Sequence, residues 1–404
     1  MIVSYTKFRS LFELPDKIDY EEFKSKIKVK RNQKIMDYTP DEFFEARNDF
    51  RLVQKEQYYR NLYEICVTDR ETTLEMWFNS HIKIDNLSKH MNFSLSDNIL
   101  KDGVIHGRLQ NKGRIVKNIN FDKIFATKKY SSEDNMPILN ELKCMFTDYI
   151  INSNLIIPHG FKKVISKDLS TIFAIMRGTR HRASIFNPYT YGWLLQNYFE
   201  GERVIAPTAG WNAYQIGFHQ TDWKEFTCID VIESVIENVS DIADYYNTNP
   251  FTENKIVSGH CCPSEKVLLE EKNYYDLSLC SPPYFNLEIY ETDNQNQSVN
   301  NFPEYNDWLE GYWNATVENI LPTLKSGGTF AFVISNYKDV FSNVKKENSN
   351  DSQINISEDM LNICKRHMTY EKTENIAWSG FSTLAGKMGT KGNVEDMHIL
   401  SKKF

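Results

Sequence analysis

The chain has 404 residues, 41% of them hydrophobic and 25% charged, which is typical of a soluble globular protein and allows two domains. No run of about 18 apolar residues occurs, so we expect no membrane-spanning helix, and the first residues lack the apolar segment of a secretory signal. The seven cysteines include no CxxC pair, which argues against a zinc site or a disulfide framework and favours reduced thiols in the cytoplasm.

The net charge of −7 hides an uneven distribution of charge along the chain. Residues 1–200 carry a net charge of +6 and residues 201–404 one of −13. Residues 101–130 and 161–190 are the most basic stretches. A basic half beside an acidic half predicts a surface that faces a polyanion. A solvated surface with chance clustering of charge is the alternative.

The N-terminal elements form no recognisable catalytic motif. Apolar residues at three- and four-residue spacing predict a helix over residues 41–65. From about residue 103, short β-prone runs broken by glycine predict a hairpin. We therefore expect an accessory region of mixed helices and hairpins over residues 1–150, which would recognise the target, and a catalytic domain over residues 151–404.

Alternation of strands and helices begins near residue 200. Apolar runs predict strands at 203–206, 226–230, 255–259, 274–281 and 329–336, with two closing strands at 375–380 and 394–403. Helical spacing appears at 234–246 and 307–325, and the polar stretches 293–301 and 345–359 are predicted mobile loops. This order predicts an α/β fold with a doubly wound, mainly parallel sheet that binds ligands at the carboxyl ends of its strands.

The most informative motif is Ser281-Pro282-Pro283-Tyr284, which directly follows the fourth predicted strand. Two prolines cannot continue a strand, and they form a rigid turn whose carbonyl groups are free to accept hydrogen bonds. The Ser281 hydroxyl and the Pro282 carbonyl are suited to accept from the amino group of a base, and Tyr284 offers a flat surface for stacking. A plain strand-ending turn with a core tyrosine is the alternative.

This motif resembles the catalytic motif of the amino-methyltransferases, which modify N6 of adenine or N4 of cytosine. The extension Phe285–Tyr290 resembles that of phage-encoded DNA methylases with SPPYFNLE-type sequences. The resemblance covers about residues 175–404. It implies a Rossmann-like sheet of the class I S-adenosylmethionine methyltransferase type, S-adenosylmethionine as cofactor, DNA as partner, and a place in the cytoplasm of the host if the protein is phage-encoded.

Further residues fall in the order that the resemblance implies for cofactor binding. The run Val204–Trp211 resembles the first cofactor motif, although Ala206 stands where an acid is common and Asn212 where a second glycine is common. Asp230 ends a predicted strand, where an acidic side chain usually accepts from ribose hydroxyls; a helix-capping aspartate is the alternative. The predicted cofactor-binding residues are Phe186, Asn187, Pro207, Ala209, Gly210, Trp211, Asp230 and Ser281.

Two basic clusters are the predicted nucleic-acid contacts. Arg177, Arg180 and Arg182 place three guanidinium groups within six residues, which suits a phosphate backbone or a carboxylate. Lys112, Arg114 and Lys117 lie in the basic stretch 101–130. For the first cluster, a solvated loop is the alternative.

These residues together predict direct methyl transfer to the exocyclic amino nitrogen of an extruded base in DNA. The sequence shows no HExxH and no CxxC pair, so we expect no metal. Three alternatives stay open: an RNA base methyltransferase, an inactive nucleic-acid-binding protein with a methyltransferase fold, and an enzyme that transfers another group. Adenine and cytosine are not distinguished, and neither the recognition sequence nor the oligomeric state is indicated.

Overall fold

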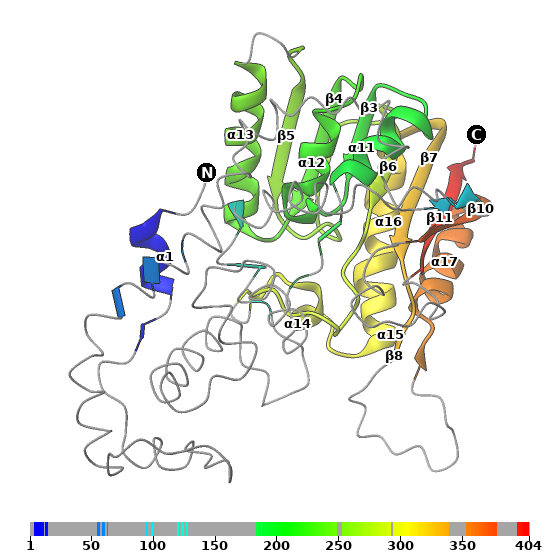
Figure 1. Ribbon diagram of the computed structural model, residues 1–404. Helices are drawn as coiled ribbons and strands as arrows, with labels where there is room; N and C mark the ends of the chain where they lie inside the picture. Colours follow the sequence, from blue (N-terminus) through cyan, green and yellow to red (C-terminus); the bar gives the residue numbers. More distant parts are fainter. Residues whose placement is uncertain are drawn as a thin grey trace, which may run out of the picture.

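The computed structural model describes residues 188–248, 253–291, 294–338, 353–377 and 394–403 continuously. Before residue 188 it describes short pieces only, namely 4–11, 13–14, 55–56, 59–60, 63, 94–95, 98–99, 119–120, 123–124, 127, 183 and 185–186. The continuous part is built around one large sheet, drawn from green to red in Figure 1. That sheet has nine strands in the order β2-β1-β10-β11-β7-β6-β3-β4-β5.

Five neighbouring strands of this sheet are parallel. They are β3 (Arg203–Ala206), β4 (Glu225–Asp230), β5 (Ile256–Cys261), β6 (Tyr275–Cys280) and β7 (Leu324–Ile334). All five were predicted from apolar runs, which are typical of parallel strands covered on both faces, whereas the edge strand β5 has no fully buried residue. In the central strand β3, in contrast, Val204, Ile205 and Ala206 are fully buried.

The direction of winding reverses between β3 and β6. From β3 the chain proceeds outward to β4 and then β5, and it next returns to β6 on the other side of β3. Right-handed crossovers place the helices of the two halves on opposite faces of the sheet. The carboxyl ends of β3 and β6 therefore flank the switch point, where a doubly wound sheet binds its ligand.

The other side of the sheet is completed by antiparallel strands. β11 (Val394–Lys402) pairs with β7 and with β10 (Met368–Ala377), which precedes it in the chain. A parallel sheet wound in this order, with one antiparallel strand inserted beside its last parallel strand, is the class I methyltransferase arrangement. The predicted fold class is thus confirmed.

The helices form two groups. α11 (Pro188–Asn197), α12 (Ala213–Phe218) and α13 (Glu233–Asn247) belong to the half with β3, β4 and β5. The other half holds α15 (Tyr305–Trp308), the π-helical segment η3 (Leu309–Asn314), α16 (Ala315–Ile320), the short η4 (Leu321–Thr323) and α17 (Ile356–His367). Figure 1 shows α15 and α16 stacked end to end beside β7, with α17 next to them.

Aromatic side chains dominate the core of the second half. The fully buried Trp313 packs edge-on against Phe330 and Phe332 of β7, at centroid distances of 6.0 and 5.0 Å. Its indole N–H donates to the Met360 carbonyl of α17 at 3.1 Å. One side chain therefore joins the π-helical segment, the central strand and α17, and satisfies its own polar atom.

Three local predictions need correction. The polar stretch 345–359 is not wholly a loop, because α17 begins at Ile356, where buried Ile356, Met360 and Ile363 form an apolar face. The loop 293–301 includes α14 (Ser298–Asn301), and Val299 is 2% exposed, so this stretch is packed instead of mobile. β7 begins five residues before the predicted start at residue 329, because it includes Ser326-Gly327-Gly328 at an irregularity of its pairing with β6.

Parts of the N-terminal region contact this sheet. β1 (Ser94–Leu95) and β2 (Asn98–Ile99) form a small hairpin, and Leu95 pairs with Ile376 of β10. α1 (Tyr5–Leu11) lies at the start of the chain. The described residues between 55 and 63 are helical, in line with the helix predicted over 41–65, whereas the hairpin predicted from residue 103 lies outside the described residues.

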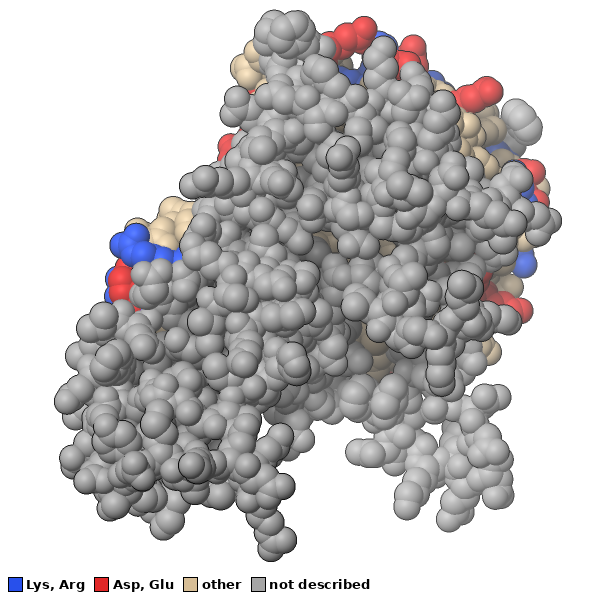
Figure 2. Space-filling view, viewed as in Figure 1, with Lys and Arg blue, Asp and Glu red and all other residues tan. Residues whose placement is uncertain are grey.

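A second, two-stranded sheet joins the ends of a long connection after β7. β8 (Tyr337–Lys338) pairs with β9 (Gln353–Ile354). Within the described part of the chain, no helix is long and apolar enough to cross a membrane. In Figure 2 the described residues at the rim carry acidic and basic side chains side by side.

Candidate active site

The first cofactor motif forms a turn with unusual backbone geometry, which we call the cofactor turn (residues 207–212). Its last three residues, Gly210, Trp211 and Asn212, all have left-handed conformations, with φ of 54°, 59° and 64°. Glycine adopts this region freely, and asparagine tolerates it better than most residues. Asn212, at the position where the family commonly has a second glycine, therefore suits the same left-handed geometry.

Gly210 is required by the protein itself. A Cβ atom at this position would lie 2.4 Å from the ring of Tyr214, which is far inside van der Waals contact. A glycine in a cofactor motif allows the ligand to approach the backbone closely. The structure shows an additional reason, which is that Tyr214 of α12 packs directly on the Gly210 backbone.

Asp230 joins the cofactor turn to the end of β4. One carboxylate oxygen accepts from the Ala209 N–H at 3.1 Å and the other from the Ile232 N–H at 3.1 Å, next to the start of α13. The aspartate thus connects the turn to the segment before α13, but the N-cap of that helix is Ile232, so the capping alternative does not hold for Asp230. Burial raises the pKa of Asp230 to about 6, against the hydrogen bonds from backbone N–H groups, which lower it.

The Ser281–Tyr284 segment, which we call the SPPY turn, follows β6 at the neighbouring strand end. Its first residue is held by its backbone, because the Ser281 N–H donates to the Tyr214 hydroxyl at 2.8 Å and the Ser281 carbonyl accepts from the Thr208 hydroxyl at 3.3 Å. Thr208 belongs to the cofactor turn. The two predicted motifs, 73 residues apart in the chain, are therefore in direct contact.

The groups predicted to face a substrate are not used by this anchoring. Among hydrogen bonds between described residues, none involves the Ser281 hydroxyl or the Pro282 carbonyl. Pro282 is buried and Ser281 partly buried, so the turn is fixed by its main chain and by its prolines. A fixed hydroxyl and a fixed carbonyl at one strand end are suited to accept from one amino group.

Tyr284 is held at its hydroxyl end. The hydroxyl donates to a Glu395 carboxylate oxygen on β11 at 3.0 Å and accepts from the Ser335 N–H after β7 at 3.2 Å. Burial raises the pKa of Tyr284 well above its usual value, so the hydroxyl stays neutral. These contacts hold the outer end of the ring between β11 and the segment after β7.

The residue after Tyr284 reverses the chain. Phe285 is left-handed, with φ of 43°, and the Leu287 N–H closes a tight turn by donating to the Tyr284 carbonyl at 2.8 Å. The buried Phe285 ring packs against Tyr305 and Trp308, with centroid distances of 5.3 and 5.6 Å. Aromatic packing thus stabilises a backbone conformation that phenylalanine otherwise avoids.

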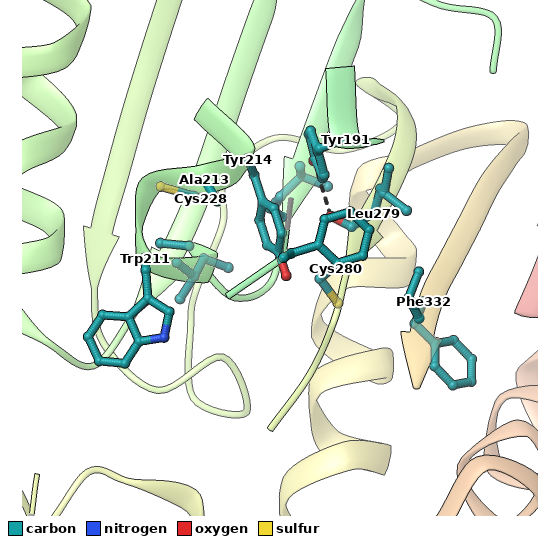
Figure 3. Close-up of a cluster of buried hydrophobic side chains, with 14 of the residues drawn as sticks. Tyr191, Trp211, Ala213, Tyr214, Cys228, Leu279, Cys280 and Phe332 are labelled. Atoms are coloured by element: carbon teal, nitrogen blue, oxygen red, sulfur yellow. Dashed lines mark hydrogen bonds between the residues drawn. The ribbon is translucent and has the colours of Figure 1, made fainter. Parts of the chain in front are cut away.

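Phe186 contacts two aromatic residues that pack beside the cofactor turn, and its role in cofactor binding stays a prediction. It packs edge-on against Tyr214 at 5.7 Å and against Tyr191 at 6.3 Å, and it is 9% exposed. Tyr191 of α11 stacks on Tyr214 with centroids 4.5 Å apart and donates to the Leu279 carbonyl of β6 at 3.2 Å. Figure 3 shows the two tyrosine rings next to each other, with the dashed line marking the bond to Leu279.

The region after the SPPY turn also contacts the cofactor turn, which the sequence did not indicate. Glu288 is 4% exposed and accepts from the Tyr290 hydroxyl, and Tyr290 packs edge-on against Trp211 at 5.4 Å. Nearby, Asn294 donates to the Val231 carbonyl at 2.9 Å, and Gln297 accepts from the Tyr290 N–H at 2.7 Å. Hydrogen bonds therefore attach the loop 293–301 to the residue after β4 and to the segment that follows the SPPY turn.

A second unpredicted contact comes from the N-terminal half. The Asn120 amide donates to the Trp211 carbonyl at 2.9 Å, although Asn120 precedes that residue by 91 positions. No local pattern marks this asparagine. Asp276, in contrast, has a structural role: it accepts from the Glu202 and Arg203 N–H groups at 3.0 Å and pairs with Lys325.

Several predicted site residues lie outside the described residues: Asn187, Arg177, Arg180, Arg182, Lys112, Arg114 and Lys117. Their contacts with cofactor or nucleic acid stay predictions. Within the described residues, no group of three or more His, Cys, Asp or Glu side chains is arranged to hold a metal ion.

Comparisons with known proteins find distant structural matches only. No protein-family model matches the chain, and no curated protein matches it in sequence. Solved structures that match include N-methyltransferase NodS from Bradyrhizobium japonicum with bound S-adenosylhomocysteine, at 10% identity and a TM-score of 0.30, covering 50% of this chain and 78% of that one.

Two further matches have similarly low identities and TM-scores. The 1,6-didemethyltoxoflavin-N1-methyltransferase of Burkholderia thailandensis shows 12% identity and a TM-score of 0.35, covering 62% of this chain and 92% of that one. TrmN from Thermus thermophilus shows 12% identity and a TM-score of 0.33, covering 53% and 48%. At such values the matches carry no functional argument, and the fold assignment rests on the strand order.

Proposed function

We propose that the protein transfers a methyl group from S-adenosylmethionine to the exocyclic amino nitrogen of adenine or cytosine in DNA. The observation that carries this proposal is the meeting of two motifs at the switch point of the sheet. The cofactor turn and the SPPY turn touch through the 3.3 Å bond between the Thr208 hydroxyl and the Ser281 carbonyl. Donor and acceptor of a transferred group would meet at this edge.

The residues present fit an adenosine-bearing cofactor. The Asp230 carboxylate accepts from the backbone N–H groups of Ala209, Val231 and Ile232 and has further lone pairs, which suit ribose hydroxyls. Trp211, which is 7% exposed, and Phe186 supply apolar surface beside the turn. When bound, S-adenosylmethionine supplies a methyl group that is already activated by its sulfonium, so no metal is needed.

The chain's own residues would orient and polarise the amino group. Its lone pair is delocalised into the ring of the base, which makes it a poor nucleophile. Acceptors at Ser281 and Pro282 favour a more tetrahedral nitrogen and stabilise the positive charge that develops there. Because the SPPY turn is held by its backbone, these acceptors are in place before the reaction, and orientation contributes further.

A covalent enzyme intermediate has no support among the described cysteines. Cys228, Cys280 and Cys364 are buried, and burial raises the pKa of each thiol well above its usual value. Cys261 is exposed and Cys262 partly buried, and partial desolvation raises the pKa of both thiols. A neutral thiol is a weak nucleophile. Direct transfer therefore agrees best with the environment of these residues.

DNA as the substrate rests on the SPPY motif and on charge. Residues 1–200 carry a net charge of +6 and residues 201–404 one of −13. The described site lies in the acidic half, so in this proposal the basic segments of the N-terminal half would supply the phosphate contacts, whereas the SPPY turn would bind the base. Tyr284 would replace the stacking partners that an extruded base loses.

The test is methyl transfer from radiolabelled S-adenosylmethionine to duplex DNA, followed by mass spectrometry of the nucleosides. We expect N6-methyladenine or N4-methylcytosine with the unchanged protein. Ser281→Ala should reduce the rate by roughly 100-fold, in the range of one lost transition-state acceptor. Tyr284→Ala should abolish transfer, whereas Tyr284→Phe, which keeps the ring, should retain most of it.

The same assay decides between the proposal and its rivals. Methylation of an RNA oligonucleotide but not of DNA would identify an RNA methyltransferase. Calorimetric titration with S-adenosylhomocysteine tests the cofactor separately. A protein that binds nucleic acid but no S-adenosylhomocysteine would be an inactive binder, and full activity of the Ser281→Ala, Tyr284→Ala double variant would refute the assigned site.

A further inference from the structure

The cofactor turn contains two non-glycine residues in the left-handed region, Trp211 and Asn212, directly after Gly210. Such conformations cost about 1 kcal/mol or more each and persist only when surrounding contacts impose them. α12 begins immediately after this turn. The contacts that impose the geometry therefore determine where the turn presents its backbone.

Those contacts come from a chain of three asparagines. The Asn120 amide nitrogen donates to the Trp211 carbonyl at 2.9 Å and to the Asn212 side-chain oxygen at 3.1 Å. The Asn120 side-chain oxygen accepts from Asn238 of α13 at 3.1 Å. Asn212 in turn donates to the Val235 carbonyl at 2.9 Å.

This network is buried, and its central amide uses each of its groups. Asn120 is 1% exposed and Asn212 fully buried. An amide has two donor hydrogens and an acceptor oxygen, and in Asn120 both the nitrogen and the oxygen have partners. Deleting it would leave the Trp211 carbonyl and the Asn212 oxygen without these bonds in a buried place, which is costly.

The surrounding segment is attached at two further points. Lys123 forms an ion pair with Glu291, which lies seven residues after Tyr284. The Ala183 N–H donates to the Ile124 carbonyl at 3.3 Å, and Ala183 precedes Phe186 closely in the chain. One short piece of the N-terminal half therefore reaches the cofactor turn, the loop after the SPPY turn and the approach to Phe186.

We propose that Asn120 is a positioning residue for cofactor binding: it sets the left-handed geometry of Trp211 and Asn212 and so makes the N-terminal half part of the cofactor site. This inference rests on the proposed function, because the ligand is the proposed cofactor. It assigns a site role to a residue of the 1–150 region, which target recognition alone does not require.

The test compares variants in calorimetric titration with S-adenosylhomocysteine and in thermal unfolding. Asn120→Ala should weaken binding about 10-fold or more, the effect of roughly one to two lost hydrogen bonds. Asn120→Asp keeps the size of the side chain but removes the amide donors, so it should weaken binding at least as much. If the asparagine only fills space, Asn120→Asp should bind like the unchanged protein.

Thr127→Val is the matched control. Thr127 is fully buried in the same segment and donates only to the Lys123 carbonyl, at 3.1 Å, away from the cofactor turn. It should keep wild-type affinity. If Asn120→Ala does not fold, Asn238→Ala, which removes one partner of Asn120 and leaves the turn contacts, should weaken binding to a smaller extent.

The outcomes separate this inference from the proposed function. Binding by the unchanged protein, weakened in both Asn120 variants but not in Thr127→Val at a comparable loss of Tm, supports the inference. Equal affinity of Asn120→Ala and the unchanged protein overturns it, and so do parallel losses of affinity and Tm in Asn120→Ala and Thr127→Val. If the unchanged protein fails to bind S-adenosylhomocysteine, the proposed function fails first and the inference falls with it.

Discussion

Asp230 shows how one side chain carries both structure and chemistry. Its carboxylate accepts backbone N–H groups from Ala209 and Ile232, and the same oxygens face the end of β4 where a ribose is expected. Its pKa of about 6 lies close to physiological pH because burial penalises the charge. The ionised form is the better acceptor for hydroxyl groups.

We therefore expect cofactor affinity to depend on pH. As the pH falls through about 6, Asp230 in the free protein takes up a proton, and the affinity for S-adenosylhomocysteine should fall. Calorimetry between pH 5 and 8 measures this, and in the acidic range the binding heat should vary with the buffer because a proton is released. Asp230→Asn should bind weakly and lose the pH dependence; an unchanged profile in that variant would exclude Asp230.

Asn212 illustrates what a pattern of residues can and cannot predict. The family pattern led us to expect a second glycine there, and the substitution looked like a departure. Its φ of 64° shows that the left-handed backbone is kept, with asparagine as the next best residue. The conformation was implied by the motif, whereas the network that holds it depends on Asn120, which no local pattern relates to the turn.

At the scale of elements, Tyr214 connects α12 with the end of β6. Its ring fills the space beside Gly210, and its hydroxyl accepts from the Ser281 N–H at 2.8 Å. Tyr191, stacked on it from α11, binds the preceding strand residue Leu279 instead. The Tyr214 hydroxyl therefore holds the SPPY turn, whereas the neighbouring Tyr191 hydroxyl does not.

Tyr214→Phe should therefore reduce the rate of methyl transfer about 10-fold with little change in cofactor affinity. The ring still packs on Gly210, but the Ser281 backbone loses a partner, so the two acceptors of the SPPY turn are less well fixed. Single-turnover kinetics and calorimetry separate the two effects. Tyr191→Phe is the control, and an equal loss of rate in both variants would show that general packing is responsible.

The elements themselves were largely predictable. β3 has the predicted bounds, since an uninterrupted apolar run is what a strand buried on both faces requires. α17 was missed because its first residues continue a polar stretch, and its apolar face emerges only from Ile356, Met360 and Ile363 together. Leu95 of the β1–β2 hairpin pairs with Ile376 of β10. Hydrophobic periodicity and composition do not indicate pairing between residues so far apart in the chain.

At the scale of the whole molecule, buried histidines make stability sensitive to acid. Burial lowers the pKa of His219 to about 3 and of His398 to about 4. His219 stacks on Tyr246 at 4.2 Å, and both ring nitrogens of His398 contact hydroxyls, of Ser357 and Thr373. Below about pH 6.5 the unfolded chain protonates these histidines and the folded protein does not, so the free energy of unfolding falls with falling pH.

Asp230 acts in the opposite direction between about pH 4 and 6, because its folded pKa is the higher one. His219→Phe removes one of the two acid-sensitive groups. The loss of stability between pH 7 and 5 should be smaller in this variant than in the unchanged protein by about 2 kcal/mol. Urea unfolding at the two pH values measures it, and equal losses would mean that His219 is protonated in the folded state.

The small hairpin β1–β2 has a consequence for the intact chain. β10 is ten residues long, and beside it the sheet continues with strands of only two residues. A long edge strand with free N–H and C=O groups is a template for pairing between molecules, and short neighbours blunt it. β1 pairs with β10 at one position, Leu95 with Ile376, so a protein trimmed to its C-terminal half would lose this short cap at the end of β10, and we expect it to aggregate through β10 more readily than the intact chain.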